Sequence, residues 1–230
     1  MKHTIFAALL LVAAPAGAAE RNYSVTSFDR IRIDGPYQVT LKTNVAPFAK
    51  VTGTQAALDG VSIKVEGRTL VVRADSGGGW GGYPGESRGP VTINVGTHDL
   101  RTAYVNGPGA LSIDKVKGLS FELAIQGSGT ARIDDVNIDQ LRIGLSGAGS
   151  TQLAGKALKM TATVRGTSTL DAEGLAVKDA VIGAEGPATV RASISGTAKV
   201  DALGLASVTL AGSPSCTVKA QGSSTVSGCK

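Results

Sequence analysis

The sequence predicts an all-β fold, a parallel β-helix (β-solenoid) with coils of roughly 20 residues each, within the range of known solenoid repeats. Three observations point to it: glycines recur at nearly constant spacing, short runs of alternating apolar residues lie between them, and aromatic residues make up only 4% of the chain. Short strands joined by glycine turns are typical of a solenoid. A helical repeat would need about a dozen residues of 3.6 periodicity per unit, and no such stretch is present.

Glycines that precede a stretch of small residues mark the repeat. Each is followed four positions later by an apolar residue or cysteine, as Gly109 is by Ile113. The first five step by 20, 20, 17 and 20, at Gly109, Gly129, Gly149, Gly166 and Gly186. Glycine suits such corners because a coil must turn sharply, often through positive φ. The spacing breaks down after Gly186.

A second pattern runs in front of these glycines. Phe121, Leu123 and Ile125 alternate with polar or small residues, and this period of two predicts strands with one face turned inward. The last inward residue of each set steps by 20, 19 and 20, at Ile125, Leu145, Val164 and Ala184. Val136 and Ile138 indicate a third, short side. A β-sandwich is the alternative, but it has no reason to keep such a step.

The chain is expected to form one continuous domain over residues 20–230. Residues 20–99 predict an irregular N-terminal β region with a glycine-rich loop at 76–89, and residues 100–230 predict the coils. Residues 205–230 are expected to form a C-terminal cap, because terminal repeats are atypical and an open strand edge invites aggregation.

The N-terminus has the features of a signal peptide. Lys2 and His3 precede an apolar run over 5–14, and residues 16–18 fit the small-x-small cleavage rule. We therefore expect residues 1–19 to be removed and the chain to be exported to the periplasm, outer surface or medium of a Gram-negative bacterium. An uncleaved anchor is the alternative, although the run is short for a bilayer. No other segment approaches membrane-spanning length.

The charge pattern argues against a nucleic-acid partner. Removal of Lys2 leaves 22 basic against 18 acidic residues, a net charge of about +4. The basic residues are scattered and do not alternate with aromatic ones, unlike a nucleic-acid interface. The net positive charge indicates either a plain solvated surface or a mild attraction to anionic surfaces of the envelope.

The two cysteines, Cys216 and Cys229, predict one disulfide in an exported chain. Two free thiols or a catalytic thiol are the alternatives. After cleavage only His98 remains as a histidine, so a zinc site of common type is hard to assemble. We expect no metal and no cofactor.

The order of strands and glycines resembles the GIN domain, a family described as "putative auto-transporter adhesin, head GIN domain". The resemblance covers about residues 25–228 and rests on weak motifs in series: residues 27–41, 58–63, 67–72, and 100–113 with Asn106-Gly-Pro-Gly. It implies an exported bacterial protein with a right-handed parallel β-helix. The family has no established activity and no agreed functional residues, so no residue role is carried over.

Two motifs could indicate chemistry. Ser87 in Gly85–Gly89 matches the nucleophile elbow, with His98 as the one available base, but the strand-turn-helix context is missing. Asp114 and Asp134 occupy equivalent corners and could share a cation such as Ca²⁺; solvated turn aspartates are the alternative. We expect no catalytic residues.

The exposed aromatic residues Trp80 and Tyr83 are the candidate ligand-binding residues, because flat rings stack on sugars or anchor a partner. The alternative is that they fold back onto the solenoid. The sequence thus predicts a non-catalytic envelope or surface binding module for a polysaccharide or surface protein. A β-helix enzyme acting on a polysaccharide and a structural protein that stacks end to end are the alternatives.

Overall fold

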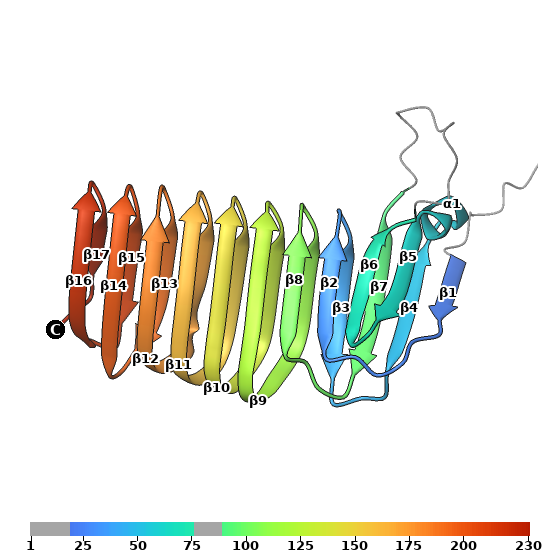
Figure 1. The fold of residues 1–230 in the computed structure, drawn as a ribbon, viewed down its shortest axis with the longest axis horizontal. Coiled ribbons are helices and arrows are strands. Elements are labelled where there is room, and N and C mark those ends of the chain that lie inside the picture. The colour runs from blue at the N-terminus through green and yellow to red at the C-terminus, as the bar shows by residue number, and fades with distance from the viewer. Residues whose placement is uncertain (1–18, 76–88) are drawn as a thin grey trace, which may run out of the picture.

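The computed structural model describes residues 19–75 and 89–230 and is a β-solenoid, as predicted. Its coils stack side by side along one axis, with the N-terminal strands at one end and the C-terminal strands at the other (Figure 1). The strands of the N-terminal part are β1 (Ala19–Tyr23), β2 (Arg30–Asp34), β3 (Gln38–Thr43), β4 (Phe48–Gly53), β5 (Val61–Glu66), β6 (Thr69–Ala74), β7 (Val91–Thr97) and β8 (Thr102–Asn106). The strands of the coils are β9 (Ala110–Gly127), β10 (Thr130–Gly147), β11 (Ser150–Gly166), β12 (Thr169–Glu185), β13 (Thr189–Ile194), β14 (Thr197–Gly204), β15 (Ser207–Ala211), β16 (Ser215–Gly222) and β17 (Thr225–Ser227).

Each long strand, β9 to β12, bends around the solenoid and contributes to two broad faces. The Tyr104 face is formed by β5, β6, β2, β8, the second halves of β9 to β12, β14 and β16. The Arg132 face is formed by β1, β4, β7, β3, the first halves of β9 to β12, β13, β15 and β17. A short third side connects the faces, and Val136 there pairs with Val116 of the preceding coil, as the sequence predicted.

Parallel pairing places equivalent apolar residues of successive coils in columns. One column on the inner side of the Tyr104 face runs through Leu123, Ile143, Ala162, Ile182 and Val200, one residue from each coil. These five side chains are at most 3% exposed. Burial of such columns is the main favourable term in the stability of the fold, because each removes apolar surface from water.

The corner between the two faces is a column of glycines with positive φ. Its members are Gly35, Gly107, Gly127, Gly147, Gly166, Gly186, Gly204 and Gly222. The alignment of Gly166 with Gly149 in the sequence was therefore wrong, because Gly166 stacks on Gly147. The early corners read Gly-x-Gly, but the second glycine gives way to Ser168 in the coil of Gly166, which shifted the apparent repeat by two residues.

The repeat also continues beyond Gly186, where the sequence indicated a breakdown. Gly204 stacks on Gly186 and Gly222 stacks on Gly204, each with a slightly smaller step along the chain than before, because the third side is shorter in these coils. Residues 205–230 thus continue the stack through β15, β16 and β17.

The N-terminal strands join the same stack in an order that differs from the chain order. Strand β2 pairs in parallel with both β6 and β8, and β3 pairs in parallel with both β7 and β9. Strands β4 and β5 then add antiparallel partners at the N-terminal end, where α1 (Gln55–Asp59) also lies (Figure 1). Thr54 caps this helix by accepting a hydrogen bond from the Ala57 amide.

The glycine column predicts a position-specific cost for an added methyl group. Gly147 has φ 109° and an added Cβ would lie 2.6 Å from the Gly127 carbonyl oxygen. Gly147→Ala should therefore lower the free energy of unfolding by about 1–3 kcal/mol. Urea-induced unfolding followed by circular dichroism measures it.

Gly144→Ala is the matched control, because its Cβ would meet only the Ala124 methyl group at 4.0 Å. This variant should be neutral or slightly more stable than the wild type, since it reduces the entropy of the unfolded chain. Equal losses in both variants would contradict the role of the glycine corner.

Candidate binding face

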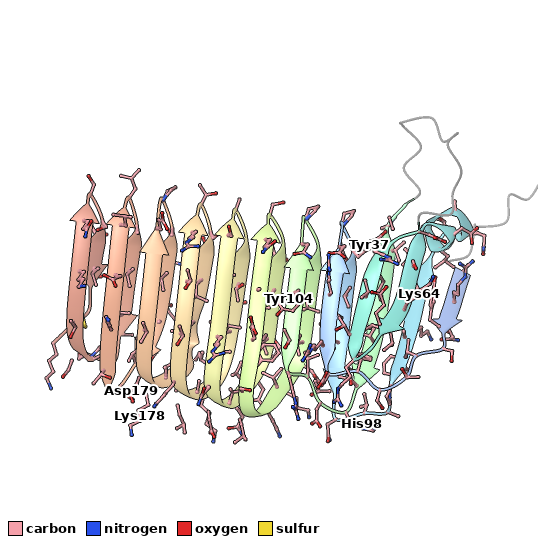
Figure 2. All side chains as sticks on the ribbon, in the orientation of Figure 1. Tyr37, Lys64, His98, Tyr104, Lys178 and Asp179 are labelled. Atoms are coloured by element: carbon pink, nitrogen blue, oxygen red, sulfur yellow. A yellow bond between two sulfur atoms is a disulfide. The ribbon has the colours of Figure 1, made fainter. Side chains whose placement is uncertain are left out.

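The Tyr104 face carries a central outward row that is short in its middle, from Ala124 to Gly183, and has long side chains at its ends. The register places one residue of each coil in this row, through Tyr104, Ala124, Gly144, Thr163, Gly183, Asp201 and Lys219. Tyr104 lies on the broad face near the N-terminal end of the row (Figure 2). Because neighbouring strands are about 4.8 Å apart, the short residues form a continuous strip along the solenoid axis.

Rows of mostly longer side chains, which are polar except for Val181 and Leu203, flank this strip on both sides. One neighbouring row contains Glu122, Arg142, Thr161, Val181 and Lys199, and the other contains Gln126, Ser146, Arg165, Glu185 and Leu203. Arg165 donates to Glu185 of the next coil at 3.1 Å, which holds part of this wall in place. The strip and its walls make a shallow furrow, which we call the Tyr104 furrow.

The same face contains three depressions. One of about 250 Å³ lies at the C-terminal end of the furrow, between Arg165, Asp201 and Lys219. A second of about 600 Å³ lies beside it, next to Lys159 and Lys199. The third, of about 310 Å³, lies toward the N-terminal end and is described next. Charged and hydroxyl groups in all three suit an extended polar ligand.

The third depression lies beside a buried carboxylate surrounded by arginines. The Asp29 side chain is 7% exposed, and its oxygens lie 2.8 Å from Arg68 Nη2, 3.8 Å from Arg101 Nε and 4.0 Å from Arg30 Nε. Only the Arg68 contact is within hydrogen-bond distance, and this contact raises the pKa of Arg68. Arg30, Arg101 and Arg142 line the depression.

The Arg132 face is rich in hydroxyl groups and carries a depression of about 370 Å³, whose lining includes Thr130, Arg132 and Ser150. One outward row consists of Thr130, Ser150, Thr169, Thr189, Ser207 and Thr225. In the next row Arg132 donates to Asp134 and to Gln152 of the following coil. Arg132, the charged residue in the lining of this depression, is thus engaged within the protein, whereas three arginines line the depression beside Asp29.

Two aspartates with lowered pKa accept hydrogen bonds from other groups of the protein. The pKa of Asp179 is lowered because the side chain and backbone amide of Thr197 donate to it, at 2.6 and 3.0 Å. The pKa of Asp59 is lowered mainly by the hydrogen bond from Arg21. Both contacts join segments far apart in the chain, and neither brings two carboxylates together for acid–base chemistry.

The predicted ligand-binding residues Trp80 and Tyr83 lie outside the described residues, as does Ser87. His98, the proposed base, lies at the same long edge of the solenoid as Lys178 and Asp179 (Figure 2). Its carbonyl oxygen accepts a hydrogen bond from the Asn44 amide, which fixes the backbone at this edge.

The two aspartates considered for a shared cation are both engaged within the protein. Asp114 accepts hydrogen bonds from the amides of Thr43 and Lys115, at 3.0 and 2.7 Å. Asp134 accepts one from Arg132 Nε at 2.6 Å. Within residues 19–75 and 89–230, no group of three or more histidine, cysteine, aspartate or glutamate side chains is arranged to hold a metal ion.

Cys216 and Cys229 form the predicted disulfide, with an S–S distance of 2.07 Å. Cys216 lies at the start of β16 and Cys229 follows β17, so the bond closes the last coil. Val218, in the same coil, is 42% exposed, whereas its stacked neighbour Val200 is fully buried. The disulfide therefore stabilises the coil with the least apolar burial.

The sequence of the chain matches the family model described as "Putative auto-transporter adhesin, head GIN domain" over residues 27–214. This match spans most of the chain. The protein belongs to the GIN domain family. The resemblance seen in residues 27–41 and in the glycine series is thereby confirmed, while no curated protein matches the sequence.

Solved structures share the fold at low sequence identity. A "putative adhesin" from Bacteroides fragilis is 16% identical, with a TM-score of 0.80 over 91% of this chain and 96% of that one. A "Putative lipid binding protein" from Parabacteroides distasonis is 18% identical, with a TM-score of 0.73 over 92% and 96%. A "putative adhesin" from Parabacteroides merdae is 16% identical, with a TM-score of 0.64 over 92% and 96%. At these identities the likeness establishes the fold of this GIN domain protein.

In the part of the chain that the structure describes, no helix has the length and apolar character needed to cross a membrane.

Loss of the disulfide should weaken the last coils of this GIN domain protein. The bond closes a loop with a sequence separation of 13, so Cys216→Ser with Cys229→Ser should cost up to about 3 kcal/mol of unfolding free energy. Thermal unfolding with and without reductant measures it, and reductant should not affect the double variant. If reductant left the thermal unfolding of the wild type unchanged, the stabilising role of the disulfide would be contradicted.

Proposed function

We propose that this GIN domain protein is a non-catalytic binding module of the bacterial cell envelope or surface, which holds an extended ligand along the Tyr104 furrow. The observation that carries the proposal is the furrow itself, a strip of short residues between rows that contain long charged side chains, such as Arg142 and Arg165. A rigid scaffold that repeats the same positions in every coil suits a polymer, because successive units of the polymer meet equivalent positions.

Family membership supports an adhesion-type role, and the signal-peptide features of residues 1–19 support export to the periplasm or outer surface. The proposed partner is an envelope polysaccharide or a surface protein. Trp80 and Tyr83 remain proposed contacts to such a partner, because they are aromatic residues in a glycine-rich stretch of the sequence.

A polysaccharide-cleaving β-helix enzyme is the second candidate. If it were a glycoside hydrolase, it would need two carboxylates placed on either side of the scissile bond, within about 10 Å of each other. The depression at Glu185 and Asp201 contains two carboxylates, but Glu185 accepts a hydrogen bond from Arg165. Glu185 is thus engaged with Arg165 within the protein, so this depression does not offer two free carboxylates. We therefore favour the binding module.

A pelleting assay tests the proposal. Residues 20–230 should sediment with at least one of purified sacculi, outer-membrane vesicles and whole cells. Gly144→Gln with Gly183→Gln should lower the bound fraction severalfold, because long side chains would fill the Tyr104 furrow. Both glycines tolerate a Cβ, so the fold should survive.

The matched control is Thr130→Gln with Ser150→Gln, which adds side chains of the same type to the Arg132 face. A third version, Trp80→Ala with Tyr83→Ala, measures the contribution of the aromatic residues. Sedimentation with none of the three materials would overturn envelope binding. Equal losses in the two glutamine variants would overturn the furrow as the site.

A further inference from the structure

The depression beside Asp29 collects positive charge from four segments far apart in the chain. Arg30 lies in β2, Arg68 in the turn before β6, Arg101 just before β8 and Arg142 in β10. Because β2 lies between β6 and β8, residues 68, 29 and 101 become neighbours in the stack. The amide of Asp29 donates to the Arg68 carbonyl, and the amide of Arg101 donates to the Asp29 carbonyl, which fixes this arrangement.

The arginines outnumber the nearby carboxylates. Four guanidinium groups face two acids, Asp29 and Glu122, which leaves a local charge of about +2. The side chains of Arg30, Arg68 and Arg101 remain 58%, 70% and 68% exposed. The buried Asp29 thus gathers cationic groups at the surface, and its single negative charge offsets only one of them.

Three of these arginines also have free hydrogen-bond donors. Within residues 19–75 and 89–230, the side chains of Arg30, Arg101 and Arg142 donate no hydrogen bond, and the Nε atoms of Arg30 and Arg101 lie too far from Asp29 for one. By contrast, Arg32, Arg132 and Arg165 each donate to a carboxylate. Guanidinium groups with free donors are suited to planar or tetrahedral oxyanions.

The lining of the depression also contains hydroxyl and amide groups. Thr102, which is 9% exposed, lies at its base, and Ser120 and Gln140 lie at its edge. The row that contains Glu122 and Arg142 runs from here along the Tyr104 furrow. A ligand bound at this point can therefore continue along the face.

We propose that this depression binds an anionic group of an acidic polysaccharide, with Arg30, Arg101 and Arg142 as its donors and Ser120 and Gln140 facing the sugar hydroxyls. The inference rests on the proposed envelope-binding function and names its ligand class. A glycan fits better than an anionic membrane, because the depression mixes acidic, hydroxyl and amide groups with its arginines, and the apolar residue in its lining, Phe121, is buried.

Isothermal titration tests the site with a galacturonate oligomer as the probe. The same oligomer with its carboxylates reduced to alcohols is the neutral control. The wild type should bind the acidic oligomer, bind the reduced one at least tenfold more weakly, and lose affinity as salt rises, because screening weakens exposed charge contacts. Arg30→Gln with Arg142→Gln should weaken binding about tenfold or more.

The charge-matched control is Arg132→Gln with Arg191→Gln, which removes two arginines from the Arg132 face. Its affinity should equal that of the wild type. Arg142→Gln alone is a second test, because Arg142 does not contact Asp29 and its loss leaves the buried cluster intact.

Equal binding of the acidic and reduced oligomers, equal losses in the two double variants, or binding only to phosphatidylglycerol vesicles would overturn the anion site. Absence of any binding to the oligomer would overturn it as well. The pelleting assay tests envelope binding separately. Failure of the anion site can therefore be distinguished from failure of envelope binding.

Discussion

The close stacking of one coil on the next at the glycine corner is the constraint on which the rest of the structure depends. Residues such as Gly127 and Gly147 pass through positive φ where a side chain would meet the backbone of the coil below. Only this tight corner lets parallel strands pair along both faces, and only that pairing places Leu123 above Ile143 and the short outward residues in one row. The core and the furrow are two consequences of one register.

That register explains how surface chemistry is arranged. On a solenoid, residues one coil apart in the sequence become neighbours in space, so a row of similar residues appears only when coils share a side-chain type. The Tyr104 face keeps short residues at Ala124, Gly144 and Gly183, whereas the Arg132 face keeps hydroxyl groups at Thr130 and Ser150. Two faces of the same sheet therefore offer different surfaces to a ligand, one with depressions lined by charged side chains, the other with a row of hydroxyl groups.

Much of the fold could be predicted from the sequence, because its signals are local. The alternation ending at Ile125, Leu145 and Val164 predicted the correct columns. The glycine series failed at Gly166, since Ser168 replaces the second corner glycine and hides the true alignment. The Asp29 cluster could not be predicted: Arg68 and Arg101 meet there because β2 is inserted between β6 and β8, and no periodicity in the sequence encodes that order. The arginines that flank the furrow could not be predicted as a group either, because only the strand register brings them together.

The central claim is that the Tyr104 face, and not the opposite one, receives the ligand. Arginine-specific labelling with phenylglyoxal, read by mass spectrometry, tests it within a single protein. The galacturonate oligomer should slow modification of Arg30, Arg101 and Arg142 and leave the rates of Arg132 and Arg191 unchanged. Protection of Arg132 and Arg191 to the same degree, or of none of the five, would contradict it.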